Sequence, residues 1–281
     1  MPVNAAEFYR RLDEYYGAGK RPEAYAFMKE QKAEAERRGD DSMSLTIANA
    51  LLGYCREFCL FDEMDGLYAE AVRCIEALGL QGTMEEAITL LNAATGFCVM
   101  GREAQSEELY RKTIALHEEL LPPGDPRLAA VYNNHGLLYR AQNKREQALQ
   151  DFRRALEILL AGNGAPDEVA SSHLNIASVC GDLAEAEQHA ALALEYYATE
   201  AGQADIHRFT AMATRAELLF RRGKFAEAGR AFEDTADAWR RFGGAKQRLA
   251  VLLRNALYSY EKAEDAAAAE RIRTRLREET A

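Results

Sequence analysis

The sequence predicts an all-α protein, a right-handed superhelical solenoid of about seven helix–turn–helix repeats. Three observations indicate this fold class. Ala, Leu, Glu and Arg, all good helix formers, dominate the composition. The last proline is Pro166, so a long C-terminal stretch lacks the residue that most often interrupts helices. A pattern of small and aromatic residues recurs at near-constant intervals, which is the signature of a repeat architecture.

The clearest repeat begins near Pro126. Its first expected helix ends in a small residue, Gly136, and an aromatic residue, Tyr139, and a turn follows at 142–144. The second expected helix carries apolar residues at helical spacing: Ala148, Phe152 and Ala155. A helix pair of this kind cannot bury its apolar face alone, so it must stack on neighbouring copies.

Six further copies account for the rest of the chain. The equivalent positions of the second helices are Met28, Tyr68, Tyr110, Phe152, Ala190, Phe232 and Ile272, at intervals of 40, 42, 42, 38, 42 and 40 residues. We therefore expect one solenoid over 1–281, with approximate repeats at 4–38, 42–79, 84–121, 126–161, 166–200, 204–242 and 246–280. The last helix, highly charged on its outer face, suits a terminal cap.

The helix-pair pattern resembles the tetratricopeptide repeat. Because its period exceeds the usual length of about 34 residues, and because of the segment Leu121-Pro-Pro-Gly-Asp-Pro126, it is most similar to the kinesin-light-chain type. The sequence departs from that type at Gln142 and Asn143, where the turn glycine is absent, and near Cys180, where the loop is shortened. The resemblance implies a concave groove lined by the first helix of each pair.

Composition and charge exclude several functions. The formal net charge of −10 disfavours general nucleic-acid binding, which requires a basic face. No apolar run approaches the roughly 18–20 residues that cross a bilayer. The N-terminus lacks the basic start and apolar core of a signal peptide. Five cysteines, an odd number without framework spacing, suit a reducing compartment, so we expect a cytoplasmic protein without membrane contact.

Catalytic signatures are missing from the sequence. It contains no phosphate-binding loop, no dinucleotide-binding glycine motif and no nucleophile elbow. The five histidines stand apart in the sequence and form no metal-binding motif, and we expect His135 to be half-buried against an adjacent helix. Cys55 and Cys59 could share a helix face, but cysteines pack as small apolar residues. We therefore expect no enzyme, no cofactor and no metal.

Asparagines recur at the position that the resemblance places toward the groove. They are Asn49, Asn92, Asn134, Asn175 and Asn255, with Arg10 and Thr214 in the other two copies. An asparagine amide both donates and accepts hydrogen bonds, so a ladder of them can pair with an extended peptide backbone. The resemblance to kinesin light chains and bacterial peptide-sensing regulators implies that use. Alternatively, these side chains bond neighbouring helices and hold the repeats in register.

Other residues are expected to face the same groove: Arg56, Arg140, Arg221 and Arg254, with Tyr9, Tyr16 and Tyr258. Guanidinium groups fork carboxylates, so these arginines favour an acidic segment or a terminal carboxylate. The alternative is that they are ordinary surface arginines paired with Glu on the same helix.

These observations favour a scaffold or adaptor that captures another protein or an extended, acidic peptide in its groove. Two other functions remain open. The chain could be a peptide-sensing regulator, or a self-assembling structural protein that forms a homodimer through its end repeats.

Overall fold

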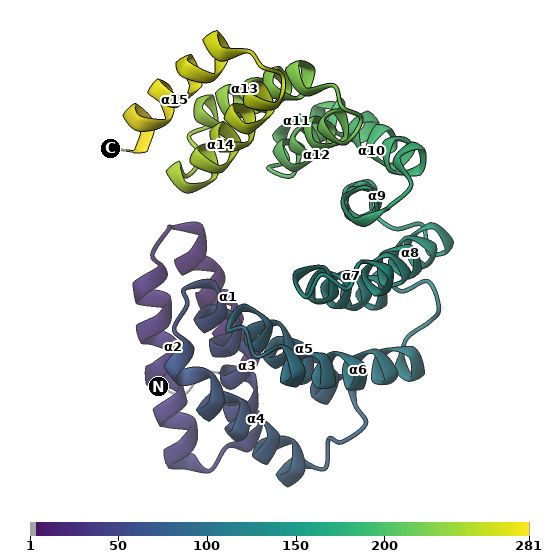
Figure 1. The fold of residues 1–281 in the computed structure, drawn as a ribbon. Helices are drawn as coiled ribbons and strands as arrows, with labels where there is room; N and C mark the ends of the chain where they lie inside the picture. The colour runs from purple at the N-terminus through teal and green to yellow at the C-terminus, as the bar shows by residue number, and fades with distance from the viewer. Residues whose placement is uncertain (1–3, 281) are drawn as a thin grey trace. The chain divides into compact units, whose positions relative to one another are not determined.

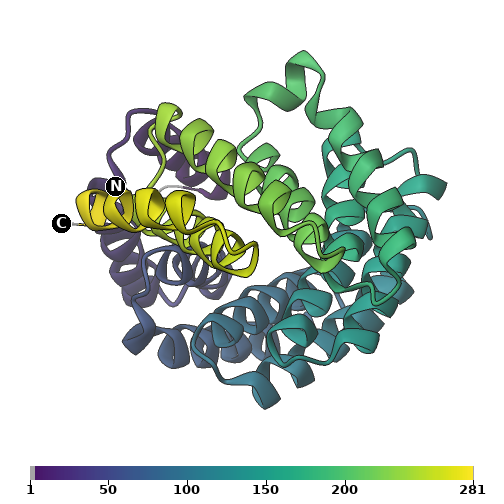
Figure 2. The same cartoon turned by 45° about the horizontal axis from the view of Figure 1, so that its top comes forward.

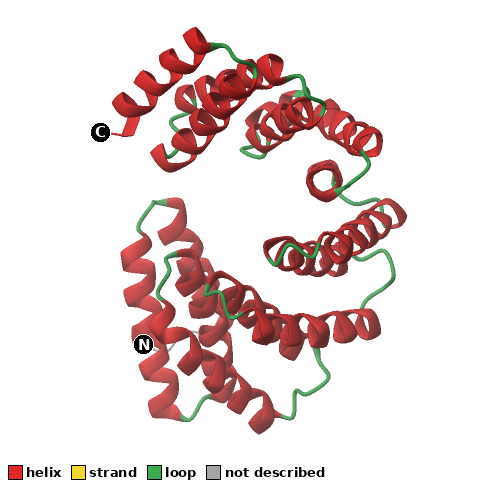
Figure 3. Cartoon of the chain, in the orientation of Figure 1, coloured by secondary structure: helices red, strands yellow, loops and turns green. Residues whose placement is uncertain are grey.

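A computed structural model describes residues 4–280, and every regular element in this range is a helix (Figure 3). The predicted all-α class of consecutive packed helix pairs is confirmed. The chain divides after Leu138 into two compact units, each of which has its own internal packing. The expectation about a signal peptide concerns a segment whose first three residues lie outside those described. None of the described helices is long and apolar enough to cross a membrane.

The first unit contains the helices up to α7 (Figure 1). They are α1 (Ala5–Gly17), α2 (Arg21–Arg38), α3 (Asp41–Glu57), the 3₁₀ helix η1 (Phe61–Glu63), α4 (Met64–Leu78), α5 (Met84–Val99), α6 (Glu103–Leu120) and most of α7 (Pro126–Ala141). Each helix packs on the next from α1 to α6, and α3 also packs on α5. Helix α3, the first of its pair, therefore contacts both its partner α4 and α5, which is the first helix of the following pair.

Local sequence explains where these helices begin and end. The side chains of Asn4 and Asp40 accept hydrogen bonds from backbone N–H groups of the first turns of α1 and α3. Pro22 lies in the first turn of α2, where its missing N–H costs nothing. Gly39 and Gly79 end α2 and α4 in the left-handed conformation, at φ 63° and 65°. These capping residues therefore account for the starts of α1 and α3 and for the ends of α2 and α4.

The largest core cluster of the first unit extends along its helix pairs. Phe97 of α5 is fully buried and packs edge-on against Tyr68 of α4, with ring centroids 5.7 Å apart. Met28, Met64 and Tyr110 are also buried in this cluster. The regular spacing of large apolar residues on second helices therefore supplies the contacts between repeats.

The second unit holds the end of α7 and the remaining helices. They are α8 (Arg145–Ala161), α9 (Pro166–Val179), α10 (Leu183–Tyr197), α11 (Glu200–Ala204), α12 (Arg208–Arg221), α13 (Phe225–Arg241), α14 (Lys246–Lys262) and α15 (Ala266–Thr280). Helix α8 packs on α9 and α9 on α10, α10 packs on α12, and packing continues in order to α15. Figure 2 shows α13, α14 and α15 as neighbouring rods.

Ion pairs fasten the terminal helix of this unit to α13. Arg271 pairs with Glu233 at 2.7 Å, and Arg275 pairs with Asp237 at 2.6 Å. The basic residues of α15 therefore neutralise carboxylates of the preceding repeat, while its buried Ile272 packs into the core.

The turns between the two helices of a pair reverse the chain direction with different backbone conformations. Gly101 and Gly223 adopt left-handed φ angles of 73° and 78°, and Asn143 does so at 59° where the glycine is absent. Asparagine tolerates this conformation better than most residues. In the shortened turn, Cys180 is extended at φ −61°, and Asp182 caps α10 directly.

The two cysteines at the end of α3 differ in their surroundings. Cys59 lies beyond the end of the helix at φ 56° and is exposed. Cys55 is buried within the helix. The two therefore do not share a helix face.

Candidate functional site

The predicted groove residues all lie on first helices of the pairs. In the first unit they are Tyr9 and Tyr16 on α1, Asn49 and Arg56 on α3, Asn92 on α5 and Asn134 on α7. In the second unit they are Arg140 at the end of α7, Asn175 on α9, Arg221 on α12, and Arg254, Asn255 and Tyr258 on α14. Their local contacts differ, and these contacts separate the residues used inside the fold from those facing solvent.

Two asparagines of the first unit hydrogen-bond to each other across adjacent repeats. Asn92 donates from Nδ2 to Oδ1 of Asn49 at 3.2 Å, and Asn49 donates from Nδ2 to Oγ1 of Thr89 at 2.9 Å. The Thr89 hydroxyl, fully buried, donates to the backbone oxygen of Glu85. This chain of bonds joins α3 to α5, as expected if these two asparagines hold the repeats in register.

The other groove candidates of the first unit are more open. Tyr9 and Tyr16 are 48% and 38% exposed, and Arg56 is half-buried. Arg10, which aligns with the asparagine position, forms ion pairs with Glu7 and Glu14 of its own helix. The two tyrosines therefore offer aromatic surface on α1, whereas the charge of Arg10 is already matched.

Two arginines of the second unit bind their own fold. Arg221 donates from Nη2 to the backbone oxygens of Cys180, at 2.7 Å, and of Gly181, at 3.2 Å. It thereby supports the shortened α9–α10 turn. Arg140 donates to Oγ of Ser178 at 3.2 Å, and burial lowers the pKa of its guanidinium. Arg254 is exposed.

Asn255 and Tyr258 meet in a small cleft between α12 and α14. The cleft has a volume of about 180 Å³, and Glu217, Phe220, Phe232 and Ser259 complete its wall. Tyr258 stacks on Phe220 with ring centroids 5.4 Å apart and planes at 28°. Asn255 is exposed, and its side-chain amide has no hydrogen-bond partner among residues 4–280. The cleft therefore combines an aromatic surface, a carboxylate and a free amide.

The structure also brings together two histidines that the sequence left apart. Nδ1 of His173 on α9 lies 2.7 Å from Nδ1 of His189 on α10, so one ring donates a proton and the other accepts it. Burial, together with His189, lowers the pKa of His173 to about 4. Burial also lowers the pKa of His189, with Arg153 acting in the same direction and Glu185 opposing it. The signal for this pair was their placement on the two helices of one repeat.

His135 is more deeply buried than expected, at 4% exposure. Its ring packs 5.5 Å from that of Tyr110 on the preceding second helix. The sequence predicted a half-buried histidine against an adjacent helix, so the neighbour was right and the depth was wrong.

The histidine pair predicts that stability falls as the pH drops from about 6.5 to about 4. The unfolded chain binds a proton below the ordinary histidine pKa, whereas the folded chain resists it down to the lowered pKa. Urea denaturation at about pH 7 and pH 5 should show a lower midpoint at the acidic pH. His173→Gln should reduce this difference, while the exposed His207→Gln should retain it. Equal pH dependence in all three proteins would contradict the assignment.

Among residues 4–280, no group of three His, Cys, Asp or Glu side chains is arranged to hold a metal ion.

Comparisons with known proteins agree with the helix-pair architecture. Residues 85–161 match the family model of the tetratricopeptide repeat. No curated protein matches the sequence. The fold is similar to a putative kinesin light chain of Podosopora anserina with nearly identical TPR-like repeats, at 14% identity and a TM-score of 0.56, over 68% of this chain and 93% of that one.

The fold is also similar to two solved structures that match nearly all of this chain. One is the apo form of the quorum sensor NprR from B. thuringiensis, at 14% identity and a TM-score of 0.65, over 98% of this chain and 76% of that one. The other is a Rap protein complexed with competence and sporulation factor, at 14% identity and a TM-score of 0.54, over 99% and 98%. At these identities the likeness establishes the fold.

Proposed function

We propose that this chain is a scaffold that binds an extended peptide segment of a partner protein, because residues 85–161 match the tetratricopeptide-repeat model and the fold is similar to that of kinesin-light-chain-like repeats. The observation that carries this proposal is the cleft between α12 and α14, where Asn255 and Tyr258 meet solvent. Binding requires no chemistry beyond hydrogen bonding and packing, so the chain acts as a binder rather than an enzyme. All five cysteines are free thiols, which supports a cytoplasmic location.

The cleft is suited to hold one peptide residue and the backbone beside it. The free amide of Asn255 offers an acceptor oxygen and two donor hydrogens, which match a peptide group without regard to its side chain. The exposed ring of Tyr258, 51% accessible, supplies rigid contact area at low entropic cost. Arg254 lies next to them on α14 and favours an acidic residue in the peptide.

The other predicted groove residues divide into those that stabilise the fold and those that we propose contact the peptide. Asn49 and Asn92 act mainly in repeat register, because their amides bond to each other and to Thr89. Arg221 and Arg140 act mainly in supporting the turns and helices they contact. The remaining candidates are proposed as peptide contacts: Tyr9, Tyr16, Arg56 and Asn134 in the first unit and Asn175 in the second.

A second candidate function is peptide sensing by a regulatory protein. The likeness to the quorum sensor NprR and to a Rap protein complexed with competence and sporulation factor favours it, because both extend over nearly the whole chain. In this case the peptide would be a free ligand rather than part of a partner protein.

The test is to select peptides from a random display library and compare Asn255→Ala/Tyr258→Ala with the wild type. Selected peptides should bind the double variant at least roughly 10-fold more weakly, because a central aromatic anchor and a backbone hydrogen bond are lost. Fluorescence anisotropy with labelled peptides measures the dissociation constant. Gln188→Ala is the matched control, because it removes an exposed amide from a second helix, α10.

Unchanged affinity of the double variant, with the same far-ultraviolet circular dichroism as the wild type, would refute binding at this cleft. Selected peptides that bind only when both ends are free would favour the sensing function. A mass that rises with protein concentration, without peptide binding, would favour self-assembly instead.

A further inference from the structure

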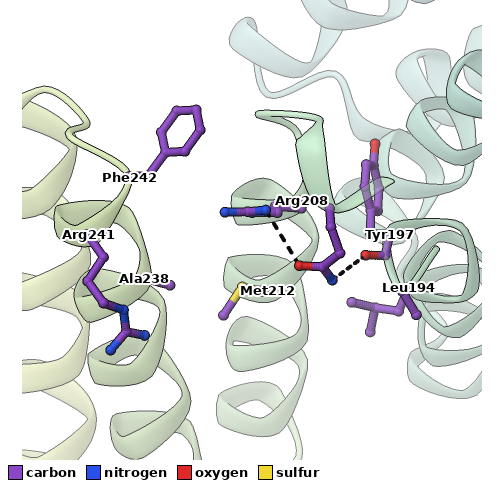
Figure 4. Close-up of a pocket in the computed structure, with 9 residues that line it drawn as sticks. Leu194, Tyr197, Arg208, Met212, Ala238, Arg241 and Phe242 are labelled. Atoms are coloured by element: carbon purple, nitrogen blue, oxygen red, sulfur yellow. Dashed lines mark hydrogen bonds between the residues drawn. The ribbon is translucent and has the colours of Figure 1, made fainter. Parts of the chain in front are cut away.

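A separate and larger pocket lies at one end of the helices α10, α12 and α13, beside the short α11 (Figure 4). Its volume is about 600 Å³, which is in the range of small-molecule sites. It shares no residue with the α12–α14 cleft, so its role is independent of peptide binding at that cleft. The residues that matter for its chemistry are Leu194, Arg208, Met212, Ala238, Arg241 and Phe242.

Two arginines give this pocket its charge. The lining contains Arg208 and Arg241 but no Asp or Glu. Some other arginines of the same unit have carboxylate partners, as in the pairs Arg222–Glu187 and Arg240–Glu279. Within the described residues neither Arg208 nor Arg241 forms an ion pair. Two uncompensated guanidinium groups in a protein of net charge −10 favour an anionic ligand.

Arg208 is held in place by aromatic rings. Its guanidinium carbon lies 4.6 Å from the ring centroid of Phe209 and 5.6 Å from that of Phe242. Figure 4 shows its side chain reaching from α12 toward α13, where Arg241 and Phe242 come from the end of that helix. Stacking on aromatic rings leaves the edge of a guanidinium group free to donate hydrogen bonds.

Apart from Gln203 and Tyr197, the side chains in the rest of the wall are apolar. Figure 4 shows Met212 below Arg208 on α12 and Ala238 beside Arg241 on α13, with Leu194 on the far side. Phe242 is 47% exposed, so its ring is open to contact with a ligand. A ligand that fits these groups must carry an apolar body beside its anionic end.

Hydrogen bonds within and beside the short helix α11 hold one wall of the pocket in place. Gln203 donates from Nε2 to the backbone oxygen of Tyr197 at 2.8 Å, and its Oε1 accepts from Arg208 at 3.5 Å. The hydroxyl of Thr199 caps α11 by accepting from the backbone N–H of Gly202. The wall next to Arg208 is thus fixed by hydrogen bonds before any ligand arrives, which lowers the entropic cost of binding.

We propose that this pocket binds an apolar carboxylate, with the carboxylate between Arg208 and Arg241 and the aryl or branched alkyl group against Met212 and Phe242. Arginine matches the geometry of a carboxylate through parallel N–H donors. The same chemistry occurs in a free small carboxylate and in the last residue of a peptide with a large apolar side chain. The experiment has one arm for each source.

The chain has a built-in probe for this site. Trp239 is its single tryptophan, and its indole ring lies 6.1 Å from the ring of Phe242. Titration of the full chain with 4-phenylbutyrate, and separately with acetyl-Gly-Ser-Phe bearing a free carboxylate, should change the tryptophan emission. The corresponding amides, 4-phenylbutyramide and acetyl-Gly-Ser-Phe-amide, should not. Whichever carboxylate binds more tightly identifies the source.

Arg241→Ala should weaken binding of that carboxylate roughly 10- to 100-fold, because one charge-assisted hydrogen-bonding group is lost. Arg241 is exposed, so this variant should fold normally, and Arg208→Gln provides a second test. Arg215→Ala, an exposed arginine on α12 outside the pocket, should bind like the wild type. The proposal is overturned if neither carboxylate changes the emission, if the amides bind equally well, or if Arg241→Ala leaves the affinity unchanged.

Discussion

Phe97→Ala is expected to destabilise the first unit by about 3–5 kcal/mol, the range for truncating a buried phenylalanine. The Phe97 ring is fully buried, contacts Tyr68 of the preceding repeat, and its centroid lies 4.5 Å from the guanidinium carbon of Arg102. Its loss would remove both the packing between two repeats and a cation–π contact. Urea denaturation followed by circular dichroism would measure the change in the free energy of unfolding.

Val99→Ala is the matched control for this prediction. Val99 lies on the same helix and is 53% exposed, so its truncation should change stability by less than about 0.5 kcal/mol. Phe97→Leu should fall between the two because it leaves a smaller cavity. A loss for Phe97→Ala no larger than that for Val99→Ala would show that Phe97 does not join the repeats as described.

Gly202→Ala is expected to destabilise the second unit by about 1–3 kcal/mol, as overpacking does. A Cβ atom at this position would lie 2.6 Å from Cα of Tyr197 and still closer to the backbone oxygen of Tyr196. Because these are backbone atoms, no side-chain rotation relieves the clash, and α11 must move away from α10. The hydrogen bond from Gln203 to Tyr197 should be lost with it.

A glycine-to-alanine substitution at another helical glycine should increase stability instead of decreasing it. Gly66 in α4 is exposed, and nothing lies within 4 Å of a Cβ atom built there. Gly66→Ala should therefore stabilise the chain by about 0.4–1 kcal/mol through the lower entropy of the unfolded state. Urea denaturation of both variants measures the two changes. Equal effects would mean that α11 does not pack closely against α10 in solution.

The fold was predictable because the residues that determine it are close together in the sequence. Residues at helical spacing, such as Ala148, Phe152 and Ala155, determine which face of each helix is buried, and neighbouring repeats lie next to each other in sequence. Turn residues added the boundaries, as at Gly101 and Gly223. Helix α11 was not predicted, because five residues carry no periodicity and this helix depends on contacts with α10.

The candidate site was predictable only in part. Alignment of the copies placed Asn49, Asn92 and Asn255 at one repeat position. It did not predict which of their side-chain amides form hydrogen bonds within the protein. That difference depends on whether the neighbouring repeat offers a partner, as Thr89 does for Asn49. Likewise, Arg221 binds backbone carbonyls in the shortened turn of the preceding repeat. Sequence spacing does not contain such contacts between repeats.

The exposed position of Cys59, just after α3, gives the chain a single convenient chemical handle. Burial raises the pKa of the Cys55 thiol to about 11 and also raises the pKa of Cys74, Cys98 and Cys180, which suppresses their reactive thiolate forms. A maleimide dye added near neutral pH should therefore attach at Cys59 alone. One fluorophore per molecule, placed without mutagenesis, allows the behaviour of the native chain to be followed at nanomolar dilution or one molecule at a time.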